Sequence, residues 1–548
     1  MKMKAITTLP LLISLVFVPV SLSAKTTHFT NINGYTLNQQ GELVQFDEML
    51  IEDDKVVSIG KPNTTSVDKV VDLQGKTLIP GLIDAHGHLL GLGENLTQVD
   101  LRTSESEQAA VKAITQFVSA HKTGVWVMGR GWNQVNWPSK QFPSKDSLDK
   151  EFADVPVYLS RIDGHAAWVN SKALEVAGIN ASTPAVEGGE IVKDENGNPT
   201  GVLIDNAMDL VWQHIPDTSL EQLRNQLDTA QQHLLSLGVT SMHDAGISQR
   251  VRDMYVEQAE AHRLNLRIYA MLAATDPNIT EMLAQGHYQD EDEFLSIRSV
   301  KAYGDGALGS RGAALLAPYS DDPDNKGLLV TPLEELPAVF DLVIGEDFQL
   351  NFHAIGDRAN RLVLQHFAKA FKKYPDNKQR HRIEHAQVIA VEDIPLFVEY
   401  GIIPSMQPTH ATSDKNMAED RLGAERLKGA YAWRTFLNQG SRIAFGSDFP
   451  VELANPFHGL HAAVTRQDGD NQPQGGWIPE ESVTLLEAFR GFTIDAAYAA
   501  FQEDSIGQLS PGMKADFIII DKDMFAIPAS QIRDIQVQQT WVNGKQVF

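Results

Sequence analysis

The chain of 548 residues contains no cysteine, which excludes disulfide bonds, thiolate metal ligands, thiol nucleophiles and lipid attachment through an N-terminal cysteine. Any metal ion must therefore be bound through nitrogen and oxygen atoms. Basic residues are also scarce: 46 Lys and Arg stand against 71 Asp and Glu, and the formal net charge is −25. Because a surface of this sign repels phosphate backbones, we expect no nucleic-acid partner.

The overall composition is that of a globular protein, with 43% hydrophobic and 21% charged residues, and it excludes a largely disordered chain or one with many membrane spans. The first 24 residues differ from the rest. Lys2 and Lys4 precede an apolar run that ends in the small residues Ser23 and Ala24. This pattern predicts a cleaved signal peptide over residues 1–24, export to the periplasm and no membrane contact after cleavage. The alternative is an uncleaved anchor, but the apolar run is shorter than the roughly 20 residues that a span needs.

The rest of the chain has two β-rich ends, residues 25–80 and 501–548, around a long middle. In the middle, short apolar runs alternate with helical patterns, which predicts a (β/α)8 TIM-type barrel over residues 81–500. A Trp-, Gly- and Pro-rich stretch at about 101–218 is too long for one βα unit, so we interpret it as a large insertion over the barrel mouth. The strand candidates slightly exceed eight: residues 77–84, 155–159, 238–243, 266–271, 297–303, 349–353, 382–385, 402–406 and 443–447.

Histidines, a lysine and an aspartate stand at the ends of several predicted strands. The first of these strands ends in His86-Gly87-His88, and alternate residues of a strand point the same way, so both imidazoles can bind one ion. An isolated His-x-His pair is weak evidence. The same residue types, however, recur at four further strand ends, and a barrel brings the carboxyl ends of its strands together. These further residues are Lys301, His353, His385 and Asp448.

This ordered set resembles the amidohydrolase superfamily of metal-dependent hydrolases. The run Val300–Arg311 and the stretch Asp163–Leu174 are similar to those of YtcJ-like proteins and N-substituted formamide deformylases. The resemblance covers nearly the whole chain after the signal peptide. It implies a small β-sandwich built from both chain ends beside the barrel.

The resemblance also implies a ligand set for one or two divalent ions, usually zinc: His86, His88, His353, His385 and Asp448. Lys301 stands where many members carry a carboxylated lysine that bridges two ions; the alternative is a salt bridge at the barrel rim and a single ion. Bound zinc lowers the pKa of water toward about 7 and polarises a carbonyl. Asp448 is the expected catalytic base, with a plain ligand or helix-capping role as its alternative.

Five further residues are candidates for substrate contact, each with a structural alternative. His165 and Trp168 lie in the insertion, where a capping role is equally compatible with the sequence. Asp305 and Arg311 follow the Lys301 strand in a glycine-rich loop, and a mutual ion pair is the alternative. His410 lies just after the seventh strand.

Two further features favour structural roles. His243 ends a strand that offers no ligand in the family pattern, so we expect it to pack or to support a ligand. Trp126, Trp132 and Trp137 could line a pocket, but tryptophans of an insertion more often pack its interior.

The functional hypothesis is a metal-dependent hydrolase of a non-peptide C–N bond, in an amide, an N-substituted formamide or a cyclic amide. One alternative is an esterase or a dipeptidase-like hydrolase that uses the same ions. Another is a catalytically silent barrel that binds a metabolite. The expected partner is a small-molecule substrate, and the resemblance is compatible with a homodimer.

Overall fold

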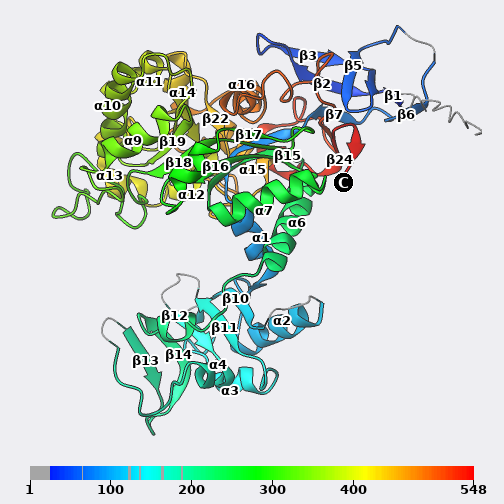
Figure 1. Ribbon diagram of the computed structural model, residues 1–548. Coiled ribbons are helices and arrows are strands. Elements are labelled where there is room, and N and C mark those ends of the chain that lie inside the picture. The colour runs from blue at the N-terminus through cyan, green and yellow to red at the C-terminus, as the bar shows by residue number, and fades with distance from the viewer. Residues whose placement is uncertain (1–24, 64–65, 121–124, 135–136, 162–165, 187–188) are drawn as a thin grey trace, which may run out of the picture.

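A computed structural model describes residues 25–63, 66–120, 125–134, 137–161, 166–186 and 189–548 (Figure 1). The predicted signal peptide and His165 lie outside these ranges. Within them, eight parallel strands form a barrel surrounded by helices, as predicted. The strands, in order around the barrel, are β8 (Leu82–Gly87), β15 (Val239–Ile247), β16 (Arg267–Ala273), β18 (Leu295–Tyr303), β19 (Gln349–Ala354), β20 (Arg382–His385), β21 (Ile403–Met406) and β22 (Ala444–Phe445).

The barrel is closed between its last and its first strand. The Asp448 amide donates to the His86 carbonyl (2.7 Å), and the His88 amide donates to the Phe449 carbonyl (2.8 Å). The Asp84 carboxylate adds side-chain bonds across the same seam, because it accepts from the amide (3.0 Å) and the hydroxyl (2.6 Å) of Ser447. This closure sets the first histidine motif directly beside Asp448.

Helices cover the outside of the barrel, and none in the described ranges is long and apolar enough to cross a membrane. The helical pattern near the end of the barrel forms two helices, because the Phe492 carbonyl accepts from the Ile83 amide (2.8 Å) and the chain leaves the helical conformation at Thr493. The helices are α1 (Leu89–Thr97), α6 (Leu220–Ser236), α7 (Gln249–Glu260), α8 (Ile279–Ala284), α9 (Leu336–Gly345), α10 (Asp357–Lys373), α11 (Pro395–Tyr400), α12 (Pro408–Asp414), α13 (Ala418–Leu427), α14 (Trp433–Asn438), α15 (Pro456–Thr465), α16 (Leu485–Gly491) and α17 (Ile494–Ala499).

The insertion is a separate body, joined to the barrel at α1 and α6 (Figure 1). It has its own apolar cores, in which Trp132, Trp137 and Trp168 pack together. Its strands form the sheet β13-β14-β12-β11-β10-β9, and the predicted strand 155–159 belongs here, which explains the surplus candidate. Its elements are β9 (Val99–Asp100), α2 (Glu107–Ala120), β10 (Val127–Trp132), α3 (Lys145–Asp149), β11 (Val157–Arg161), β12 (Ala166–Val169), α4 (Ser171–Val176), β13 (Gly189–Lys193), β14 (Pro199–Asp205) and α5 (Asp209–Trp212).

Both chain ends build the β-sandwich. One sheet has the order β5-β4-β1-β6, and the other, β25-β24-β23-β7-β2-β3, mixes N-terminal and C-terminal strands. Phe29, Phe517 and Trp541 pack in the core between the two sheets. The strands are β1 (Thr26–Thr30), β2 (Asn33–Leu37), β3 (Leu43–Phe46), β4 (Met49–Glu52), β5 (Lys55–Ile59), β6 (Lys69–Asp72), β7 (Thr77–Pro80), β23 (Phe517–Ile520), β24 (Val537–Val542) and β25 (Lys545–Gln546).

Candidate active site

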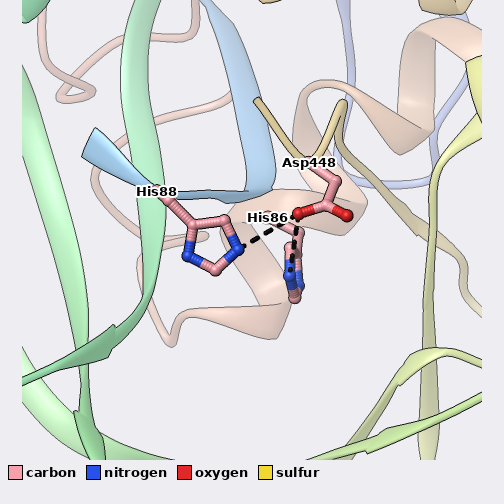
Figure 2. A group of neighbouring side chains, drawn as sticks. All are labelled: His86, His88 and Asp448. Carbon is pink, nitrogen blue, oxygen red and sulfur yellow. Dashed lines mark ion pairs between the residues drawn. The ribbon is translucent and has the colours of Figure 1, made fainter. Parts of the chain in front are cut away.

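Three histidines surround the carboxylate of Asp448 at the carboxyl end of the barrel. The Nε2 atoms of His88 and His86 lie 3.2 and 3.6 Å from Oδ1 of Asp448 (Figure 2). The Nε2 atom of His410, at the start of α12, lies 3.5 Å from Oδ2. Two groups of side chains therefore have the spacing to hold a metal ion, and they share Asp448: His86 with His88, and His385 with His410.

The remaining predicted ligands lie around the same point. The ring of His385 has its centroid 4.5 Å from that of His353 and 4.8 Å from that of His86. The Nζ atom of Lys301 lies 3.4 Å from Nε2 of His86. Since Lys301 is only 1% exposed, it is not a solvent-facing residue of the barrel rim. The structure thus brings together all six residues for which the sequence predicts a metal-binding role.

Several side-chain atoms of this group are free to bind an ion. The Nε2 atoms of His353 and His410 and the Oδ1 atom of Asp448 are buried and have no hydrogen-bond partner among the described residues. Buried polar atoms normally have a hydrogen-bond partner, so the convergence of these three unpartnered atoms indicates that a bound group, such as an ion, belongs between them. Imidazole and carboxylate donors suit a divalent ion such as zinc. The residues present therefore fit a metal centre.

Burial decides the charge state of the nitrogen donors. Burial and, to a smaller extent, the nearby Lys301 lower the pKa of His86 to about 4 and that of His353 to about 3. Burial also lowers the pKa of Lys301 to about 8. The imidazoles of His86 and His353 are consequently neutral at pH 7 and keep the lone pair that a metal ligand needs.

The carboxylate of Asp448 is ionised. Burial alone would raise its pKa, but the hydrogen bond with His88 and the electrostatic interaction with His86 and His410 outweigh burial and hold the pKa below its usual range. The backbone at this residue has a positive φ of 62°, and His385 has a φ of 73°. Left-handed backbone at non-glycine residues is strained and is concentrated at functional sites. Here it turns two candidate ligands inward.

The structure corrects two of the predicted substrate contacts, Trp168 and Asp305, and gives the third, Arg311, an acidic partner. Trp168 is fully buried in the insertion core, and its indole N–H donates to the Ser144 carbonyl. Asp305 is 2% exposed and accepts hydrogen bonds from the backbone amides of residues 314, 355 and 356. Arg311 pairs with Asp321, so the alternative of an Asp305–Arg311 ion pair is also wrong. The sequence pattern missed these outcomes because the burial of Trp168 and Asp305 depends on how other segments pack around them, and the partner of Arg311 depends on the conformation of the following loop.

Sequence reasoning also missed buried residues that contact the predicted ligands. Glu384 accepts from Nδ1 of His86 (2.5 Å), and Gln407 contacts Nδ1 of His385 through Oε1 (2.8 Å). A signal was present in the segment Arg382-Ile-Glu-His385, where two charged residues alternate within a buried strand. Charge at an inward position of a barrel strand indicates a partner inside the barrel.

Comparison with known proteins assigns the chain to a family. A model of the amidohydrolase family matches residues 69–548. This protein belongs to the amidohydrolase family. The amidohydrolase is 33% identical to a putative amidohydrolase, YtcJ, of Bacillus subtilis (89% of this chain, 91% of that protein). It is 25% identical to an N-substituted formamide deformylase of Arthrobacter pascens (87% of this chain, 89% of that protein).

A solved structure agrees with this assignment. An uncharacterized metal-dependent hydrolase from Pyrococcus furiosus superposes with a TM-score of 0.75 at 28% identity, over 91% of the amidohydrolase and 99% of that chain. The barrel fold and the membership of a family of metal-dependent hydrolases, which the resemblance implied, are therefore confirmed.

Proposed function

We propose that this amidohydrolase cleaves a C–N bond outside the peptide backbone of a small molecule, and that amides and N-substituted formamides are its substrate class. The observation that carries the proposal is the convergence of several imidazoles on one ionised carboxylate in a buried site, where the Nε2 atoms of His353 and His410 and the Oδ1 atom of Asp448 have no hydrogen-bond partner among the described residues. The formamide deformylase of Arthrobacter pascens supports the choice of bond.

We further propose zinc as the metal, in one or two ions. His86, His88 and Asp448 would hold one ion; His353 and His385, with Lys301, would hold the other. Nitrogen and oxygen donors without cysteine suit this ion. When bound, a divalent ion polarises the carbonyl to be attacked and lowers the pKa of water.

The chain's own residues then move the protons. Asp448 accepts the proton of the attacking water at a carboxylate oxygen and delivers it to the leaving nitrogen, which needs that proton to depart as an amine. We assign His410 to the substrate and not to an ion. Its Nε2 lies 3.5 Å from Asp448 Oδ2 and has no hydrogen-bond partner among the described residues, and it donates a hydrogen bond to the substrate carbonyl oxygen as negative charge develops there. Burial of the site strengthens both interactions because it excludes water.

Lys301 serves this site best as a carbamate. The uncharged ε-amine attacks CO2, a new N–C bond forms, and one proton leaves to solvent, so the side chain becomes an anion with two donor oxygens. The buried amine is suited to this step, because its lowered pKa increases the uncharged fraction at neutral pH. A free ammonium at the same place would repel a bound cation.

Metal content and hydrolysis test the proposal together. We expect protein purified without chelators to contain stoichiometric zinc, and its intact mass to include one CO2 that disappears in Lys301→Met. It should hydrolyse members of a panel of N-substituted formamides and amides, lose this activity on chelation and regain it with zinc. Protein without bound metal, or protein that cleaves esters or dipeptides but no formamide or amide, would refute the proposal.

A further inference from the structure

A buried ion pair lies beneath the candidate metal centre, inside the barrel. Glu384 and Arg382 are adjacent inward-facing residues of β20, and both are 0% exposed. Nε of Arg382 lies 2.7 Å from Oε1 of Glu384, and Nη2 donates to Oε2 at 3.1 Å. Removing two charges from water is costly unless each charge has further specific partners. The other contacts of Glu384 and Arg382 therefore indicate the role of the pair.

The partner of Glu384 on its other side is His86. Nδ1 of the imidazole donates to Oε2 at 2.5 Å, and His86 is itself 0% exposed. An ionised carboxylate only accepts, so this bond places the ring proton on Nδ1 and leaves the lone pair on Nε2. Nε2 is the atom that faces Asp448 at 3.6 Å. Glu384 therefore selects the tautomer and the ring orientation that bind a metal ion.

The guanidinium of Arg382 joins this pair to three other strands. It donates to the Ala85 carbonyl on β8 (2.6 Å), to Oγ of Ser405 on β21 (2.8 Å) and to Nδ1 of His243 on β15 (2.8 Å). Ala85 directly precedes His86, so the same side chain fixes the backbone that carries the imidazole. His243 thus contacts the arginine behind His86 and supports this ligand indirectly.

We propose that Glu384 and Arg382 are positioning residues that set the affinity of the site for its divalent ion. Both residues act through His86. Glu384 fixes the orientation of the imidazole ring and raises its basicity. Arg382 holds Glu384 and the backbone at Ala85 in place. This inference rests on the proposed function, because it requires His86 to be a metal ligand.

The test is the metal affinity of Glu384→Gln, which keeps the size of the side chain and removes its charge. Zn²⁺ and Co²⁺ dissociation constants are measured by competition with a chelator, and the visible absorption of bound Co²⁺ reports the ligand geometry. Partners of this kind typically contribute about 10–100-fold to metal affinity, and we expect a loss of that size with a changed Co²⁺ spectrum.

Asp516→Asn is the matched control. Asp516 forms a buried pair with Arg267, at 2.6 and 3.0 Å, between the barrel and the β-sandwich. This variant should lower the thermal midpoint and leave metal affinity unchanged. Equal affinity in Glu384→Gln and the unsubstituted protein, or an equal loss in both variants, overturns the inference.

Two further outcomes are informative. If Glu384→Gln does not fold, metal affinity is measured in Ser405→Ala, which removes one hydrogen-bond acceptor of Arg382 and little volume. Weaker ion binding by this variant supports the inference, and unchanged affinity overturns it. If the unsubstituted protein binds no ion, the proposed function fails together with the inference. Metal-dependent hydrolysis by the unsubstituted protein, with unchanged affinity in Glu384→Gln, refutes the inference alone.

Discussion

His381, just before β20, should make the stability of the protein fall as the pH falls below about 6.5. Its ring is 1% exposed, Nδ1 accepts from the Leu350 amide at 3.0 Å, and Nε2 contacts Oδ1 of Asn377 at 3.1 Å. A proton on Nδ1 would face an N–H donor and bury a charge. Burial accordingly lowers the pKa of His381 from 6.5 to about 3.

The sign and size of the effect follow from linkage. The unfolded state binds the proton first as the pH falls, so stability that is fully present above the unfolded pKa of 6.5 is lost progressively toward the folded value of about 3. Each pH unit in this window corresponds to about 1.4 kcal/mol, so this one histidine removes about 2 kcal/mol from the free energy of unfolding at about pH 5.

The assay compares His381→Gln with the unsubstituted protein by urea unfolding at about pH 7.5 and pH 5, with chelator present so that ion binding does not contribute. The glutamine amide can accept and donate in place of the ring but does not titrate. The variant should therefore lose about 2 kcal/mol less than the unsubstituted protein between the two pH values. Equal losses in the two proteins would show that the reasoning about His381 is wrong.

Three further predictions concern the site, the insertion and the N-terminus. Asp448→Asn should lower kcat by about 10²–10⁴-fold in a steady-state assay, because it removes the proton acceptor; full activity would exclude that role. Trp132→Ala should destabilise the insertion by about 3–5 kcal/mol, seen as an earlier unfolding transition, and leave metal content unchanged; an unaltered transition would contradict the packing of Trp132. Protein recovered from the periplasm should begin at Lys25 by mass spectrometry, whereas an intact residue 1 would favour the membrane anchor.

The sequence alone was sufficient for the barrel and for the main members of the site. A strand has a period of two residues and a parallel barrel collects the carboxyl ends of its strands at one face. These two rules predict that His86 and His88 point the same way and lie near Asp448, although the sequence positions are far apart. The tight turn at Asn543-Gly544 between β24 and β25 is likewise a local feature, because an Asn-Gly pair favours this type of hairpin turn through its own backbone conformation.

Tertiary structure alone decided which polar residues face one another and which are buried. Glu384 meets His86 across 298 positions, and His410 reaches Asp448 only because α12 begins at the barrel mouth. Trp168 shows the opposite case, because a residue predicted to contact substrate lies in the apolar core of the insertion. Local rules give the direction of a side chain relative to its own strand or helix. Its partners and its exposure depend on how distant segments pack, which is settled by the burial of the whole chain.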